Sequence, residues 1–138
     1  MNQHLANISI LVSDYDEAIR YYTDTLGFEL VEDTRLSEEK RWVLVRPRAE
    51  QPGCNLLLAR AANPEQASRI GNQTGGRVFL FLHTDNFDRD YEKYRSKGVE
   101  FLRPPSLEAH GKVSIFKDIY GNLWDLIQPG YAAGKESV

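Results

Sequence analysis

One acid, Asp125, lies in an otherwise apolar segment near the end of the chain. It belongs to the sequence DIYGNLWDLIQP, residues 118–129. If this segment is a strand, Leu123, Asp125 and Ile127 share one face, because alternate side chains of a strand point the same way. A carboxylate on an apolar face predicts one of two arrangements. Either the face lines a cavity in which the acid binds a ligand or acts as a general base, or the acid is structural and is held by a partner elsewhere in the fold.

The three histidines are the other candidates for acid–base or metal chemistry. His83 ends an apolar run and shares strand parity with Phe79 and Phe81, so we expect it to face the same side as they do. There it could ligate a metal, hydrogen-bond a ligand or serve as a structural histidine. His110 precedes a glycine in a predicted loop, where it is either structural, exposed or at the edge of a cavity. His4 is expected to be solvated.

Three further residues are candidates for ligand contact, each for its own reason. Trp42 is either a core residue or a platform for a ligand, because a large aromatic ring buries much apolar area wherever it packs. Arg46 could pair with an anionic ligand or face water. Asn7 offers a donor and an acceptor to the fold or to a ligand. The charged run SEEKR, residues 37–41, is expected to be a solvated turn.

Composition excludes several classes of function. The net charge is −3, the charges are mixed along the chain, and 41% of the 138 residues are hydrophobic. Nucleic-acid binding would require a basic face, and a membrane span would require about 20 consecutive apolar residues. Neither is present, and no secretory signal is visible, so we expect a cytoplasmic protein without nucleic-acid or membrane partners. A lone cysteine, Cys54, leaves no internal disulfide and no cysteine-based zinc site.

The elements that must position these residues occur twice along the chain. Residues 13–30, SDYDEAIRYYTDTLGFEL, align with residues 84–101, TDNFDRDYEKYRSKGVEF, so that Gly27 falls on Gly98. Each segment has an aspartate as its second residue and a helical periodicity that ends at its glycine, which adopts a positive φ without strain. A β-rich run precedes each helix and strand-like segments follow it. The sequence therefore predicts an α+β protein in which a βαβββ unit is repeated.

The predicted strands besides those directly after the two helices are 7–12, 41–47, 54–60, 77–83, 112–118 and 122–128. A short helix, 63–71, and a glycine-containing linker, 72–77, are expected to join the two modules.

The repeat resembles a known family. A helix that opens with an acid and ends in Leu-Gly-Phe, combined with DIYGNLWDLIQP at the end of the second copy, is similar to the vicinal oxygen chelate superfamily of glyoxalases, bleomycin resistance proteins and extradiol dioxygenases. The resemblance implies a single domain, 1–138, built from modules at about 5–60 and 77–129. It also implies mixed sheets that curl around a cavity, and a homodimer.

The resemblance also places the ligands that metal-using members supply. Carried over by position, they are Asn7, Leu57, Phe79 and Asp125 in this chain. Divalent metals in such sites favour imidazole nitrogen and carboxylate oxygen, so only Asp125 is a good donor. We therefore expect no metal and no other cofactor, with a divalent metal as the alternative. The predicted ligand-binding residues are Asn7, Trp42, Arg46, Leu57, Phe79, Phe81, His83 and Asp125.

Three functions stay open at this point. The first is a metal-independent protein with a cavity that binds an unidentified small molecule. The second is a metal-dependent enzyme, a glyoxalase-like lyase or a dioxygenase, against which Leu57 and Phe79 argue. The third is a metal-free enzyme in which Asp125 is the catalytic general base, with its basicity raised by the surrounding apolar face.

Overall fold

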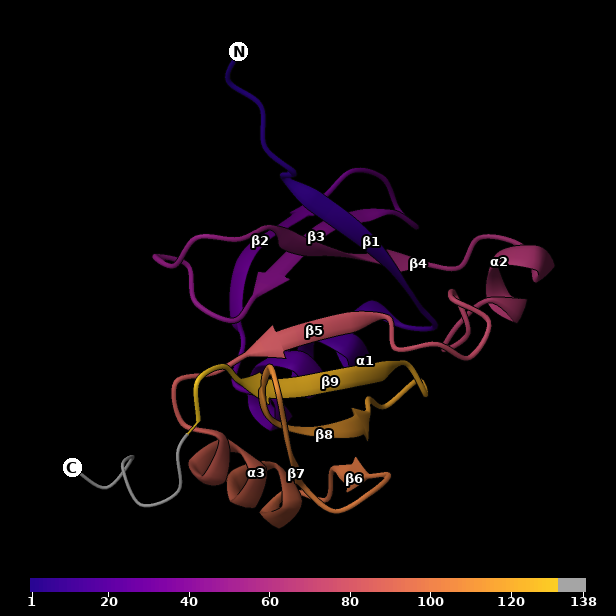
Figure 1. Cartoon of the computed structure of the whole chain (residues 1–138). Helices are drawn as coiled ribbons and strands as arrows, with labels where there is room; N and C mark the ends of the chain where they lie inside the picture. Colours follow the sequence, from indigo (N-terminus) through magenta and orange to yellow (C-terminus); the bar gives the residue numbers. More distant parts are fainter. Residues whose placement is uncertain (132–138) are drawn as a thin grey trace. The chain divides into compact units, whose positions relative to one another are not determined.

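The computed structural model describes residues 1–131 (Figure 1). The chain divides into two compact units, Met1–Ile70 and Gly71–Val138. Each unit contains one mixed sheet and a helix that follows the first strand of that sheet, so the predicted α+β class is confirmed. Within residues 1–131 no helix is both long enough and apolar enough to cross a lipid bilayer.

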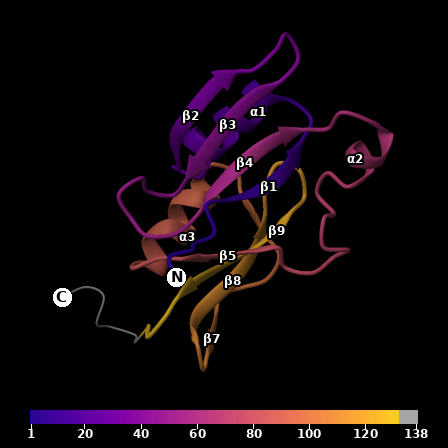
Figure 2. The ribbon, with the colours of Figure 1, turned by 90° about the horizontal axis from the view of Figure 1, so that it is seen from above.

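The first unit has the predicted βαβββ order. Its elements are β1 (Asn7–Val12), α1 (Tyr15–Arg20), the π-helical turn η1 (Tyr21–Thr25), β2 (Glu29–Arg35), β3 (Arg41–Arg46), β4 (Asn55–Arg60) and α2 (Pro64–Ser68). The strand order is β1-β4-β3-β2, which Figure 2 shows from right to left, and β1 runs parallel to β4. Asp14 caps α1, because its Oδ2 accepts a hydrogen bond from Glu17 N at 2.8 Å.

The core of the first unit lies on one face of this sheet. Ile10, Val12 and Leu58 have no exposed surface, and neither have Ala18 of α1 and Tyr22 of η1. The helix α1 contacts β3 and β4 on this side. Residues of the other parity in the same strands therefore form the helix-free face of the first sheet.

The second unit repeats this order with one addition. Its elements are β5 (Leu80–His83), α3 (Phe87–Ser96), β6 (Glu100–Phe101), β7 (Ser106–Glu108), β8 (Gly111–Lys117) and β9 (Leu123–Gln128). The strand order is β5-β9-β8-β6, and β5 runs parallel to β9. β7 was not predicted; it pairs with β8 as a short hairpin. β5 is shorter than the predicted 77–83, and β6 ends before Pro104 and Pro105, which have no N–H to donate to a ladder.

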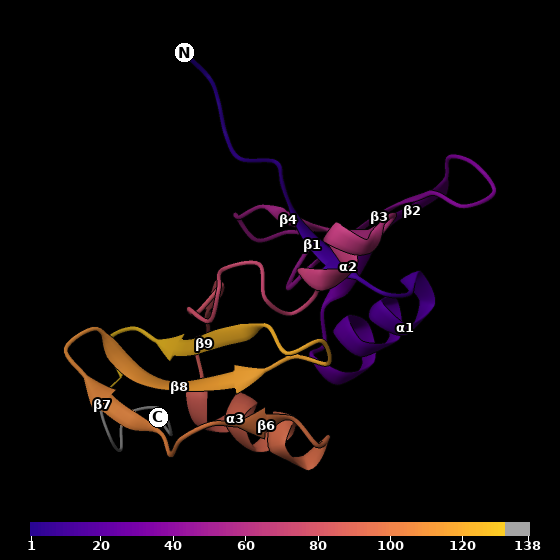
Figure 3. The ribbon, with the colours of Figure 1, turned by 90° about the vertical axis from the view of Figure 1, so that its right-hand side faces the viewer.

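An aromatic cluster joins α3 to this sheet. The ring of Phe116 stacks on Trp124 at a centroid distance of 5.7 Å and meets the edge of Tyr94, from α3, at 5.5 Å. Figure 3 shows α3 along one side of β8 and β9. Asp125, the neighbour of Trp124 in β9, therefore points to the opposite, helix-free face of the second sheet.

Candidate functional site

A tight turn between β8 and β9 sets the position of Asp125. Asp118 is buried in this turn, and both of its carboxylate oxygens accept hydrogen bonds. Its Oδ1 accepts from Tyr120 N at 2.9 Å and Asn122 N at 3.0 Å, and its Oδ2 accepts from Asn122 Nδ2 at 2.9 Å and Trp124 Nε1 at 3.0 Å. Gly121, with φ of 97°, completes the turn. The DIYGN motif is thus a structural device that fixes the start of β9.

Asp125 lies in the middle of the second sheet, because β9 is a central strand. It pairs with Phe81 of β5 on one side and with Ile115 of β8 on the other. Side chains that are paired across strands share a face, so these three form a row on the helix-free face of the second sheet. Phe81 is 62% exposed, whereas Asp125 is only 9% exposed. A largely buried acid therefore lies beside an exposed aromatic ring.

The carboxylate of Asp125 is incompletely paired. Its Oδ1 is buried, and none of the described residues donates a hydrogen bond to it. Burial raises the pKa of Asp125, and the positive potentials of Arg103, His110 and His83 oppose this rise. An acid with an empty acceptor oxygen and a raised pKa has two chemical uses: it can accept a hydrogen bond from a ligand, or it can take up a proton.

Two of the three charged or titratable neighbours of Asp125 were outside the predicted site. His83 was predicted to share a face with Phe81, and the register of β5 against β9 agrees. His110 is in the turn between β7 and β8, a hairpin that the sequence did not predict. Arg103 follows the short strand β6, and its carbonyl oxygen accepts a hydrogen bond from Ser114 Oγ at 2.8 Å. No local pattern in the sequence marks Arg103 as a neighbour of an acid on β9.

The predicted site residues of the first unit also share a face. Asn7 pairs with Asn55, and Asn55 Nδ2 donates to Asn7 Oδ1 at 3.0 Å. Asn55 Oδ1 accepts from Arg46 Nη1 at 3.4 Å. Leu57, two residues after Asn55, and Trp42, four residues before Arg46, have the same strand parity. These residues lie on the helix-free face of the first sheet, where Asn7 already has a protein partner.

Arg46 has a structural role that the sequence did not suggest. Its Nη2 donates to the carbonyl oxygens of Gln51 and Gly53, the latter at 3.1 Å, and so holds the loop between β3 and β4. It neither faces water freely nor presents its whole guanidinium to a ligand. Of the guanidinium nitrogens of Arg46, only Nε is buried without an acceptor among residues 1–131.

Phe79 precedes β5, and its N–H donates to Leu123 O at 2.8 Å, which extends the pairing of β5 with β9.

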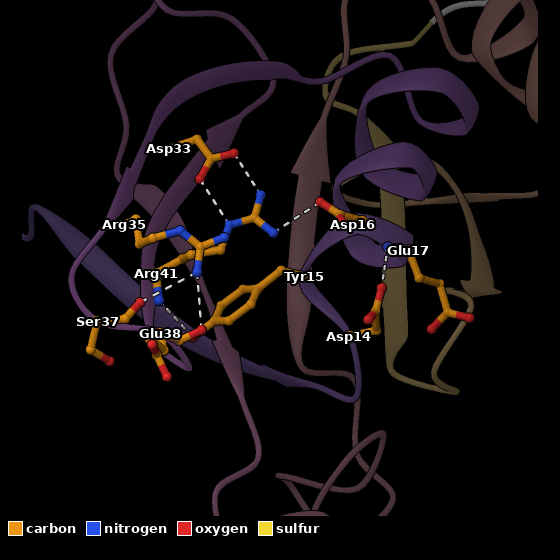
Figure 4. Close-up of polar contacts among 9 residues, drawn as sticks. All are labelled: Asp14, Tyr15, Asp16, Glu17, Asp33, Arg35, Ser37, Glu38 and Arg41. Atoms are coloured by element: carbon orange, nitrogen blue, oxygen red, sulfur yellow. Dashed lines mark hydrogen bonds and ion pairs between the residues drawn. The ribbon is translucent and has the colours of Figure 1, made fainter.

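A further polar cluster surrounds Arg41 (Figure 4). Arg41 binds both carboxylate oxygens of Asp33, at 3.1 and 2.7 Å, and Asp16 Oδ1 at 2.9 Å. The guanidinium of Arg41 lies 5.2 Å from the centre of the Tyr15 ring, and the backbone N–H of Arg41 donates to Tyr15 Oη at 3.1 Å. Only 18% of the Arg41 side chain is exposed. The prediction of a solvated turn was therefore wrong for Arg41, which ties α1 to the β2–β3 hairpin.

The four positions that the resemblance assigns to metal ligands do not offer a donor set that suits a divalent metal. Asn7 and Leu57 are in the first unit and Phe79 and Asp125 in the second, and the set offers a single carboxylate, one amide and two hydrocarbon side chains. Within residues 1–131 no group of three or more histidine, cysteine, aspartate or glutamate side chains is arranged to hold a metal ion. Divalent metals of this kind require three or four nitrogen, sulfur or oxygen donors from the protein.

Comparison with known proteins identifies relatives along nearly the whole chain. The family model of the Glyoxalase/Bleomycin resistance protein/Dioxygenase superfamily matches residues 3–126. A protein of Shewanella frigidimarina (strain NCIMB 400), described as uncharacterized, is 54% identical over 129 residues, which are 93% of this chain and 95% of that one.

Two solved structures are similar in fold and in sequence. The crystal structure of UcmS2 has a TM-score of 0.78 and 32% identity, and the match covers 92% of this chain and 98% of that chain. The crystal structure of TnmS3, an antibiotic binding protein from Streptomyces sp. CB03234, has a TM-score of 0.75 and 29% identity. That match covers 94% of this chain and 98% of the TnmS3 chain.

Proposed function

Because this chain belongs to the Glyoxalase/Bleomycin resistance protein/Dioxygenase superfamily, we propose that it binds a small organic molecule without the help of a metal ion. The ligand would contact the helix-free face of the second sheet. The observation that carries this proposal is the buried Oδ1 of Asp125, which no residue among 1–131 satisfies and which lies beside the exposed ring of Phe81.

Energetics favour a ligand at this place. A buried polar atom without a hydrogen-bond partner lowers the stability of the fold by about 1–3 kcal/mol. Such an atom in a folded protein needs an explanation, and a role in function is one. The similarity to TnmS3, an antibiotic binding protein, supports the same conclusion, because 29% identity extends over nearly the whole of both chains. The donor set at the metal positions of relatives supports the metal-independent form of the proposal.

The test is a binding screen combined with metal analysis. Protein purified without chelator is expected to contain well under one equivalent of zinc, nickel, iron or manganese by plasma mass spectrometry. Its melting temperature is expected to stay the same after chelation and to rise with some members of a panel of aromatic antibiotics, since a ligand that binds only the folded state stabilises it. A full equivalent of tightly held metal, or no rise with any compound, would contradict the proposal.

A second candidate function is proton transfer by Asp125. The observation in its favour is the burial of Asp125, which is 9% exposed, because burial raises the pKa of the carboxyl and so makes it a stronger base. Proton NMR of a bound compound in D₂O distinguishes the two functions. Exchange or conversion that stops in the Asp125→Asn variant indicates an enzyme, whereas an unchanged compound indicates a binding protein.

A further inference from the structure

The row of Phe81, Asp125 and Ile115 places one polar acceptor between two apolar side chains. Paired side chains in neighbouring strands have Cβ atoms about 4.5–5.5 Å apart, so a flat molecule of one or two rings spans all three positions. Phe81 is 62% exposed and offers a ring face or edge for stacking. Ile115 is half-buried on the other side of the acid. An aromatic ligand fits this row better than a strongly polar one.

The acceptor at the centre requires a donor from outside the sheet. Oδ1 of Asp125 is buried, and no donor among residues 1–131 reaches it. The backbone N–H groups of β9 are used in the ladders with β5 and β8, between which it lies. An ionised carboxylate oxygen only accepts hydrogen bonds, so the complementary ligand atom is an O–H or N–H group.

The charges around the row favour a neutral ligand. Arg103, His110 and His83 are near enough to Asp125 to act on its ionisation. A cationic ligand would be attracted by the carboxylate of Asp125 but repelled by Arg103, and an anionic ligand would be attracted by Arg103 but repelled by the carboxylate. A neutral hydroxyl avoids both repulsions and still forms a charge-assisted hydrogen bond with Asp125.

We infer that the row of Phe81, Asp125 and Ile115 binds a neutral aromatic ligand whose hydroxyl group donates a hydrogen bond to Asp125 Oδ1. This inference rests on the proposed function and adds the chemical class of the ligand. It assigns Phe81 the contact with the ring and Asp125 the recognition of the hydroxyl. A methyl ether of the same ring system keeps the ring contact but has no hydrogen to donate.

The experiment compares 1-naphthol with 1-methoxynaphthalene by titration into ¹⁵N-labelled protein. The shifts of amide signals give both dissociation constants and identify the site. A charge-assisted hydrogen bond contributes about 1.5–3 kcal/mol, so 1-naphthol is expected to bind roughly ten- to a hundredfold more tightly. The shifts are expected at Phe81, Ile115 and Asp125.

Three variants make the comparison specific. Asp125→Asn is expected to bring the preference for 1-naphthol down to a few-fold, because the charge of the acceptor is lost. Glu92→Gln makes the same change of charge on an exposed residue of α3 and is expected to keep the full preference. Phe81→Ala is expected to weaken both probes equally, and this holds whether or not the Asp125 variant folds.

Equal binding of the two probes to the wild type overturns the inference, and so does a full preference for 1-naphthol in Asp125→Asn. Binding with amide shifts confined to residues outside the row overturns it as well. In each of these cases a small molecule still binds, so the proposed binding of a small molecule stands, although shifts confined to residues outside the second sheet would contradict its proposed place. If neither probe binds, the inference fails, and the screen with aromatic antibiotics alone decides the proposed function.

Discussion

The same substitution, aspartate to asparagine, is expected to have opposite effects at Asp118 and Asp125. Both acids are buried and both belong to the segment that forms the last turn and strand, but their surroundings differ. Asp118 accepts four hydrogen bonds from Tyr120, Asn122 and Trp124. Oδ1 of Asp125 accepts none from residues 1–131. The carboxylate of Asp118 is therefore a stabilising group, whereas that of Asp125 is an uncompensated one.

The expected loss of stability in Asp118→Asn follows from the groups that donate hydrogen bonds to Asp118. Asparagine has one acceptor oxygen, so its amide nitrogen would face two N–H groups that now donate to a carboxylate oxygen. Two hydrogen bonds to a charged group are lost, each with a contribution of about 1.5–3 kcal/mol. We expect Asp118→Asn to lower the free energy of unfolding by about 3–6 kcal/mol. Asp125→Asn removes a buried charge without breaking a bond at Oδ1, and we expect a change of about 0 to 1 kcal/mol in the stabilising direction.

The assay is urea unfolding followed by tryptophan fluorescence. A Trp42→Phe background leaves Trp124, which is 3% exposed in the second unit, as the only tryptophan. With an m-value of about 1.5 kcal/mol per M, Asp118→Asn is expected to lower the midpoint by about 2–4 M. Circular dichroism checks each midpoint, because Asp118 contacts the reporter itself. A wild-type midpoint for Asp118→Asn, or a clear loss of stability for Asp125→Asn, would refute the reasoning.

Three further outcomes follow from the same contacts. Since the raised pKa of Asp125 means that the folded state holds its proton more tightly than the unfolded state, the wild type should gain stability relative to Asp125→Asn as the pH falls through that raised pKa toward about 4. Arg41→Gln should lower the stability of the first unit by about 1 kcal/mol in urea unfolding, because it removes a bidentate ion pair that solvent partly screens. This loss should be present above about pH 4 and disappear as the pH falls through the lowered pKa of Asp33, whose hydrogen bond with Arg41 favours the carboxylate. Gly111→Ala should cost roughly 2–4 kcal/mol in thermal or urea unfolding, because its φ is 136° and a Cβ would lie 2.2 Å from the carbonyl oxygen of Gln128.

Each of these outcomes has a control. The other acids with shifted pKa values contribute equally to both proteins, so the difference in pH slope between the wild type and Asp125→Asn reports Asp125, and an equal slope in both would contradict the assignment. Arg35→Gln, at a more exposed arginine of the same hairpin, should have a smaller effect than Arg41→Gln. Gly75→Ala meets no atom within 4 Å at a φ of 70°, so it should cost only about 1–2 kcal/mol. A larger cost there than at Gly111 would show that close contact is not the cause.

Sequence periodicity was sufficient for the elements and for the faces of the strands. The repeat around Gly27 and Gly98 predicted two βαβββ units, and the structure has this order with one added strand, β7. Asp125 was assigned to the face opposite Trp124 from strand parity, and the pairing with Phe81 and Ile115 agrees. These features are local, because the direction of a side chain depends on the two-residue period of its own strand. The homodimer, the cytoplasmic location and the binding of a small molecule stay predictions.

Tertiary structure decided which polar side chains have partners. Arg46 was a candidate for ligand contact, but it holds the carbonyl oxygens of Gln51 and Gly53. Arg41 was assigned to a solvated turn, but it pairs with Asp33 and Asp16. Backbone carbonyls carry no signature in the sequence, and an ion pair between distant segments depends on how these segments pack. For the same reason the sequence placed Asp125 on its face, but only the folded chain showed that its Oδ1 lacks a hydrogen-bond donor among residues 1–131.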